Sequence, residues 1–224
     1  MAKPSVLRRI RSALRRMFPQ VAVFFKTIGL AYSPRSILRT SGYIESVKTR
    51  KPCRRDGSPL PWMNYHVIQF LEQRLTKDLS LFEYGSGNST LFYAALVKMV
   101  VSLEEDEEWY NYIKQNMPQN VTLLHFDALG DSVYSESAGR QGNSFDVIVV
   151  DGSDRIACVK TAPAALTDAG VVILDDTHYA PFEEATDFLA RAGFRKFDFE
   201  GLKPNSIRAY RTTIYYRSNN CLGI

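Results

Sequence analysis

The sequence predicts an α/β protein whose core is a parallel, doubly wound sheet. Short apolar runs typical of strands alternate with segments whose apolar residues recur at the helical period. Two of the runs, Phe145–Val150 and Gly170–Leu174, are almost entirely apolar. Glycine, serine and acidic residues follow directly after several runs. Because such sheets bind ligands at the carboxyl ends of their strands, these residues are the first candidates for a functional site.

Length and composition fit a folded globular protein of one domain with an appendage. Of 224 residues, 45% are hydrophobic and 23% are charged. The cysteines Cys53, Cys158 and Cys221 lie far apart, which argues against a disulfide scaffold and a cysteine-built zinc site and suits a reducing compartment. No apolar run reaches about 18 residues, and no secretory signal is evident. We therefore expect a cytoplasmic protein without a transmembrane span.

The charge is split along the chain, although the net charge is only +4. Residues 1–55 contain 14 Lys and Arg and a single acidic residue, Glu45, whereas residues 56–224 contain 14 Lys and Arg and 23 acidic residues. We therefore predict two parts with different roles, a basic N-terminal extension over 1–55 and an α/β domain over 56–224.

Residues 5–18 of the extension have the pattern of an amphipathic basic helix. On a helical projection the apolar side chains fall on one arc of roughly 120°, and the arginines fall opposite. This pattern indicates a helix lying on an anionic membrane, so we expect peripheral association with the inner membrane face. Nucleic-acid contact, an organelle-targeting peptide and packing on the body of the protein are the alternatives.

The remaining elements follow in order. Residues 33–62 are rich in turn-forming Pro and Gly, and a helical period covers 64–76. Seven strands are expected at Leu79–Tyr84, Met99–Leu103, Val121–Phe126, Phe145–Val150, Gly170–Leu174, Phe194–Phe199 and Ala209–Arg217. Helices are expected at Ser89–Val97, Asp106–Asn116, Ile156–Leu166 and Phe182–Ala192. Residues 130–144, which are polar and rich in Gly and Ser, are predicted to form a loop.

A glycine turn follows the first strand. Gly85 and Gly87 permit a tight turn and close approach of a ligand, and the next helix offers free N–H groups. Thr90 stands where a strict dinucleotide fingerprint has a third glycine. Glu104, 19 residues beyond Gly85, is placed to accept hydrogen bonds from a ribose, and Asp127 could receive an adenine amine. The alternatives are an acid at a helix start for Glu104 and a turn residue for Asp127.

Acidic residues also end the fourth and fifth strands. Asp151 follows the fourth strand, and Asp175 and Asp176 follow the fifth, so the three carboxylates should converge on one rim. Such oxygen ligands suit Mg²⁺, which predicts a metal site of Asp151, Asp175 and Asp176. Carboxylates also serve as general bases, as does histidine, which predicts Asp151, Asp176 and His178 as catalytic residues. Capping of the following helices and a hydrogen-bonded rim histidine are the alternatives.

The motifs EYGSGNST, SLEEDEEW, FDVIVVDG and GVVILDD resemble, in order and spacing, those of the class I S-adenosylmethionine-dependent methyltransferases over about residues 64–217. The segment PLPWMNY and the C-terminal tail also look like methyltransferase-like proteins of unassigned substrate. The resemblance implies a seven-stranded, Rossmann-like sheet with the last strand antiparallel. It implies S-adenosylmethionine as cofactor, bound by Glu83, Gly85, Ser86, Gly87, Glu104, Asp127 and Asp151. The three rim carboxylates are similar to the Mg²⁺ set of catechol-type O-methyltransferases.

The expected function is methyl transfer, most simply to oxygen, on a small-molecule, glycan or lipid-linked acceptor. Asp151, or Asp175 and Asp176 through a metal, would orient the acceptor, and Trp62 and Tyr65 could form part of its wall. An NAD(P)-binding oxidoreductase also fits a glycine turn followed by an acid. A non-catalytic adaptor that docks on a membrane or nucleic acid is the third reading. Strand order discriminates the first two.

Overall fold

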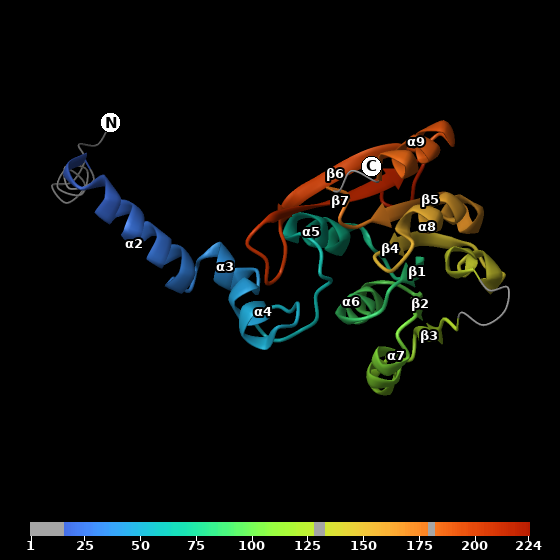
Figure 1. Cartoon of the computed structure of the whole chain (residues 1–224), viewed down its shortest axis with the longest axis horizontal. Coiled ribbons are helices and arrows are strands. Elements are labelled where there is room, and N and C mark those ends of the chain that lie inside the picture. Colours follow the sequence, from blue (N-terminus) through green and yellow to red (C-terminus); the bar gives the residue numbers. More distant parts are fainter. Residues whose placement is uncertain (1–15, 128–132, 179–181) are drawn as a thin grey trace.

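A seven-stranded sheet forms the centre of the molecule, in the order β3-β2-β1-β4-β5-β7-β6 (Figure 1). The computed structural model describes residues 16–127, 133–178 and 182–224. The strands are β1 (Ser80–Tyr84), β2 (Met99–Glu104), β3 (Val121–His125), β4 (Phe145–Val150), β5 (Leu166–Leu174), β6 (Arg195–Leu202) and β7 (Ala209–Tyr216). The first five strands are parallel, and β7 runs antiparallel to both neighbours. The predicted fold class is confirmed.

The position of β7 separates this sheet from a dinucleotide-binding one. A short turn joins β6 to β7, too short for a crossover helix, so the two strands pair antiparallel. The returning β7 inserts between β5 and β6. In dinucleotide-binding sheets the sixth strand lies directly beside the fifth, in the order 3-2-1-4-5-6. The strand order therefore disfavours the oxidoreductase alternative.

Two hydrophobic cores lie on the two faces of the sheet. The helices that cover these faces are α5 (Tyr65–Arg74), α6 (Asn88–Leu96), α8 (Arg155–Thr161) and α9 (Glu183–Arg191). Successive strand side chains point to opposite faces, so Ile148 packs with α8 and α9 while Val147 packs with α5 and α6. Both residues are fully buried. This two-sided burial accounts for the nearly continuous apolar strands of the sequence.

Two of the predicted segments differ from the structure. The helix predicted at Ile156–Leu166 ends at Thr161, a 3₁₀ turn containing Pro163 follows, and β5 already begins at Leu166. The predicted loop 130–144 contains short 3₁₀ turns, and its Tyr134 is buried against Tyr84 and Phe126. This loop therefore contributes to the core despite its polar composition.

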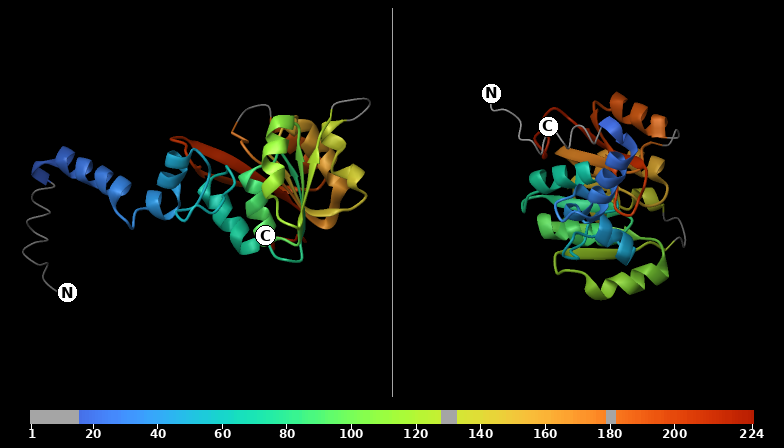
Figure 2. Two further views of the ribbon diagram at one scale, coloured as in Figure 1. Left: turned by 90° about the horizontal axis from the view of Figure 1, so that it is seen from below. Right: turned by 90° about the vertical axis from the view of Figure 1, so that its left-hand side faces the viewer.

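The N-terminal extension forms α2 (Pro19–Tyr32), α3 (Ile37–Thr40) and α4 (Tyr43–Thr49). Figures 1 and 2 show α2 projecting away from the sheet and its helices. The predicted basic helix 5–18 lies almost wholly outside the described residues, and α2 was not expected. The extension is joined to the body where Asn88 Nδ2 donates to the Pro52 carbonyl at 2.8 Å and where Arg54 pairs with Glu72. Within the described ranges, no helix has the length and apolarity to cross a membrane.

Candidate functional site

The glycine turn after β1 requires glycine at Gly85 for two reasons. Its φ is +87°, a left-handed conformation that residues with a Cβ rarely adopt. A Cβ at this position would lie 2.9 Å from Gly152 Cα, so the turns after β1 and β4 touch backbone to backbone. The Gly85 N–H also donates to the Leu103 carbonyl at 2.9 Å. The turn is therefore fixed between the ends of β2 and β4.

Glu104 holds the glycine turn from the end of β2. One carboxylate oxygen accepts the Ser86 N–H at 3.1 Å, and the other accepts the Glu105 and Asp106 N–H groups, each at 3.0 Å. The side chain is largely buried, yet it lines the cleft above the turn. Backbone donors fix the carboxylate in place, which is the preorganisation that recognition of a hydroxyl pair requires.

A cleft of about 780 Å³ opens above the turn. The residues that line it include Gly85, Ser86, Gly87, Glu104 and Asp151, which are five of the seven residues predicted to bind the cofactor. Binding of a cofactor by these residues stays a prediction. Its volume lies in the range of small-molecule and cofactor sites. Trp62 also lines the cleft with 45% of its surface exposed, whereas Tyr65, the first residue of α5, packs against the core. One of the two predicted acceptor-wall residues therefore reaches the cleft.

Trp109 also lines the cleft. Its apolar neighbours Tyr112 and Ile113 indicate from the sequence only that it packs within its helix. It lies on α7 (Glu107–Ile113), and the Asp106 side chain caps this helix by accepting the Trp109 backbone N–H at 2.7 Å. The indole Nε1–H donates to the Ser86 carbonyl at 2.9 Å, and the ring stacks on Tyr112 with centroids 5.3 Å apart. The aspartate cap predicts where this helix begins, but no sequence signal placed the Trp109 ring in the cleft.

Glu83 lies beneath the turn, not on the cleft wall where the resemblance placed it. The side chain is fully buried, and one carboxyl oxygen accepts hydrogen bonds from Thr90 Oγ1 at 2.5 Å and Ser102 Oγ at 2.7 Å. Burial raises the pKa of Glu83 to about 7, and the hydroxyl donors oppose this shift. Glu83 therefore supports the turn from below.

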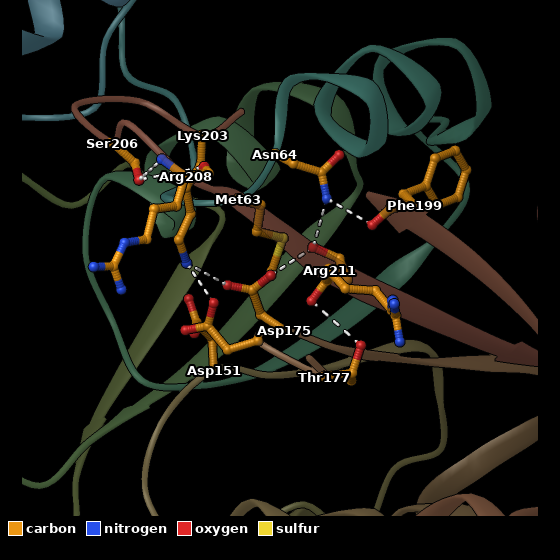
Figure 3. Close-up of polar contacts among 12 residues, drawn as sticks. Met63, Asn64, Asp151, Asp175, Thr177, Phe199, Lys203, Ser206, Arg208 and Arg211 are labelled. Atoms are coloured by element: carbon orange, nitrogen blue, oxygen red, sulfur yellow. Dashed lines mark hydrogen bonds and ion pairs between the residues drawn. The ribbon is translucent and has the colours of Figure 1, made fainter. Parts of the chain in front are cut away.

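The three rim carboxylates converge as predicted, and the side chains of Lys203 and Arg155 lie among them. Figure 3 shows the Lys203 ammonium group directed at Asp175, beside Asp151. Ligand atoms of Asp151, Asp175 and Asp176 lie within 4.8 Å of one another. Lys203 Nζ lies 3.1 Å from Asp175 and 2.6 Å from Asp176. Arg155 lies 3.0 Å from Asp151 and 3.6 Å from Asp176.

The two cationic side chains, Lys203 and Arg155, determine whether the carboxylate cluster can hold a metal ion. Both oxygens of the buried Asp175 have donors, since Thr212 Oγ1 donates to one at 2.5 Å and Lys203 to the other. Asn64 Nδ2 in turn donates to Thr212 Oγ1 at 3.1 Å. A Mg²⁺ ion would have to displace the Lys203 ammonium group, which already forms ion pairs with the Asp175 and Asp176 carboxylates. The residues present do not fit a resident Mg²⁺ ion.

Asp151 is the rim carboxylate that faces the cleft. Burial raises its pKa well above the ordinary value, and the nearby charge of Asp175 adds to this, while Arg155 and Lys203 oppose it. Arg155 also donates to the Asp151, Gly152 and Asp175 carbonyls at 2.9 to 3.1 Å, so it binds the ends of β4 and β5 together. Asp175 and Asp176 lie behind Asp151 and do not line the cleft.

Two predicted site residues lie away from the cleft. The His178 ring meets the Tyr210 ring edge-on, with centroids 4.9 Å apart, and lines a separate cavity with Thr186 and Asp198. Asp127 is exposed beyond the end of β3 and is not part of the cleft wall. The structure thus brings Asp151 and the glycine turn together but separates His178 from them. An adenine contact for Asp127 stays a prediction.

Comparison with known proteins identifies the fold. No protein-family model matches the sequence, and a search of curated proteins gives no match. A protein from Klebsiella pneumoniae assigned as an O-methyltransferase has 18% identity and a TM-score of 0.53, over 90% of this chain and 99% of its own. Precorrin-6y C5,15-methyltransferase from Geobacter metallireducens has 16% identity and a TM-score of 0.52, over 68% of this chain and 87% of its own.

A third similar structure is the O-methyltransferase TomG from Streptomyces achromogenes, determined in complex with S-adenosylmethionine. It has 16% identity and a TM-score of 0.50, over 67% of this chain and 77% of its own. At these identities the likeness concerns the fold. The fold is that of the class I S-adenosylmethionine-dependent methyltransferases, as the sequence motifs implied.

Proposed function

We propose that this protein is an S-adenosylmethionine-dependent methyltransferase that methylates an acceptor oxygen. The observation that carries the proposal is that the glycine turn at Gly85 and the Glu104 carboxylate bonded to it line one cleft. The cleft belongs to a sheet in which β7 lies between β5 and β6. The close approach of Gly85 to Gly152 leaves no room for a side chain in the turn. A turn of bare backbone with a fixed carboxylate beside it suits an adenosyl ligand.

Each cleft residue has a distinct role in this proposal. When bound, S-adenosylmethionine supplies a methyl group on a sulfonium that needs no further activation. The backbone at Gly85–Gly87 contacts the ligand, and Glu104 accepts hydrogen bonds from the ribose hydroxyls. Asp151 accepts the proton of the acceptor hydroxyl, because a carboxylate with a raised pKa is the stronger base.

The rim cluster positions Asp151 without a metal. Arg155 contacts the Asp151 carboxylate, and Arg155 with Lys203 balances the charges of Asp175 and Asp176. The acceptor itself is proposed only by class, as a small alcohol, a glycan or a lipid-linked molecule. The adaptor alternative predicts the same fold with no turnover.

A turnover assay tests the proposal. S-adenosylhomocysteine release is measured with S-adenosylmethionine and a panel of alcohols, phenols and glycans. Asp151→Asn should lower the rate at saturating S-adenosylmethionine at least a hundredfold, the usual contribution of a general base. Asp154→Asn, three residues away on an exposed turn, is the matched control and should keep the wild-type rate. A wild-type rate for Asp151→Asn would contradict this role of Asp151.

A further inference from the structure

Helix α2 is an apolar helix that the rest of the described chain does not cover. None of its 14 residues is buried. The large apolar and aromatic side chains exposed on it are Val21, Val23, Phe24, Phe25, Ile28, Leu30 and Tyr32. Figures 1 and 2 show the helix standing clear of the sheet domain. A helix that is apolar on most sides is normally covered by protein or lipid, and an apolar surface of this kind marks an interaction site.

The length of α2 decides how it could meet a lipid bilayer. Fourteen residues span about 21 Å at 1.5 Å per residue, whereas the hydrocarbon core is about 30 Å thick. The helix is therefore too short to cross the membrane, and contact with lipid would place it at the membrane surface. Phe24, Phe25 and Tyr32 are aromatic residues of the kind that gather at that level.

The net positive charge of the segment around α2 indicates that the membrane surface it contacts is anionic. Residues 16–55 contain nine Lys and Arg against Glu45 alone. Two of the nine, Lys48 and Arg54, form ion pairs within the described part of the chain. The uncompensated positive charge complements an anionic lipid surface, where each basic residue contributes about 1 kcal/mol.

A small basic hollow lies beside α3 and α4. Arg39, Lys48 and Arg55 line a space of about 170 Å³ together with Ile44 and Glu45. The Arg39 Nε group is buried, and no hydrogen-bond partner for it lies within the described residues. A buried donor without a partner is costly. The cationic side chains that line the hollow suit a phosphate group, which accepts charge-assisted hydrogen bonds.

We propose that residues 19–55 form a docking surface for an anionic phospholipid membrane. In this arrangement α2 lies in the interface, and the hollow at Arg39 and Arg55 takes the phosphate of a lipid headgroup. Arg50 and Lys51, from the same segment, line the cleft, so the docking surface and the cleft share one stretch of chain. The proposal holds whether or not methyl transfer occurs.

Vesicle flotation of the full chain tests the apolar half of the proposal. Wild-type protein should float with vesicles of phosphatidylcholine and phosphatidylglycerol, and much less with phosphatidylcholine alone. Phe25→Glu, at a side chain 66% exposed, should lower vesicle affinity at least tenfold, because it replaces the burial of an aromatic ring by a charge. Ile207→Glu is the matched control, since Ile207 is 90% exposed on the body, and it should float as wild type.

A charge double variant tests the hollow. Arg39→Ala with Arg55→Ala should weaken binding to anionic vesicles roughly thirtyfold, from two charges of about 1 kcal/mol each. Arg191→Ala with Arg195→Ala, two exposed arginines on the body, should have no such effect. Circular dichroism must show all variants folded.

Three results would overturn the proposal. The first is failure of the wild type to float with anionic vesicles. The second is equal flotation of wild type and Phe25→Glu. The third is a wild-type dimer in light scattering that Phe25→Glu converts to monomer without any vesicle binding, which would assign α2 to a second copy of the chain.

Discussion

Substitution of Gly85 by alanine should abolish binding of the cofactor in the cleft and should also lower the stability of the protein. The left-handed φ of +87° costs an alanine about 1–2 kcal/mol. The added Cβ would also lie 2.9 Å from Gly152 Cα and 3.0 Å from Gly152 N, both backbone atoms that cannot rotate away. Overpacking of this kind costs about 1–3 kcal/mol, so we expect a total loss of about 2–5 kcal/mol. The turn must shift by several tenths of an ångström, which moves the backbone that contacts the cofactor.

Gly193→Ala isolates the effect of the clash. Gly193 has a nearly identical φ of +84°, but nothing lies within 4 Å of its missing Cβ. This variant should lose only about 1–2 kcal/mol in chemical denaturation and bind S-adenosylmethionine as wild type in calorimetry. Gly85→Ala should show no measurable binding under conditions where it remains folded. Wild-type affinity in folded Gly85→Ala would refute the assignment of the turn to the cofactor.

Three further variants test the surroundings of the cleft. The pKa of Glu83 is raised from 4.5 to about 7, so its contribution to stability is complete below pH 4.5 and is lost as the pH rises through 7. The loss is about 3 kcal/mol, and urea unfolding of Glu83→Gln should not show it. The same pH dependence in Glu83→Gln and wild type would contradict this role of Glu83. Lys203→Met should destabilise the protein by about 3–5 kcal/mol, because the buried Asp175 carboxylate loses its cationic partner. Mn²⁺ should raise the melting temperature of this variant but not that of wild type. An equal rise in wild type would show that the cluster binds metal while Lys203 is present. Trp109→Phe removes the hydrogen bond from the indole Nε1–H to the Ser86 carbonyl. Calorimetry should then show two- to tenfold weaker binding of S-adenosylmethionine, with unchanged stability of the protein. Unaltered affinity would show that Trp109 contributes only packing.

The sheet could be predicted from the sequence because its signals are local. Strands buried on both faces are almost continuously apolar, as in Phe145–Val150, and polar residues mark their ends. The family resemblance implied an antiparallel last strand, and the short turn before β7 gives the physical reason for it. Helix α2 was missed because its apolar residues do not follow one stripe and Lys26 interrupts them. Amphipathic periodicity instead drew attention to residues 5–18.

The site could be predicted only in part, because its partners come from distant segments. The strand ends indicated that Gly85, Glu104 and Asp151 lie close together, and all three line the cleft, because the carboxyl ends of parallel strands meet at one edge. Lys203 lies in the turn between β6 and β7, 27 residues beyond Asp176, and no sequence pattern links a lysine there to the rim. The acidic residues alone therefore suggested a metal where the structure places an ammonium group.

The central claim is that the cleft binds an adenosyl cofactor, and calorimetric titration of the purified chain tests it most directly. S-adenosylmethionine and S-adenosylhomocysteine should each bind at one site per chain, equally with and without Mg²⁺, because Lys203 and Arg155 already form ion pairs with the three rim carboxylates. NADH, the control, should not bind. Absence of binding by both adenosyl ligands, or binding of NADH in their place, would contradict the account.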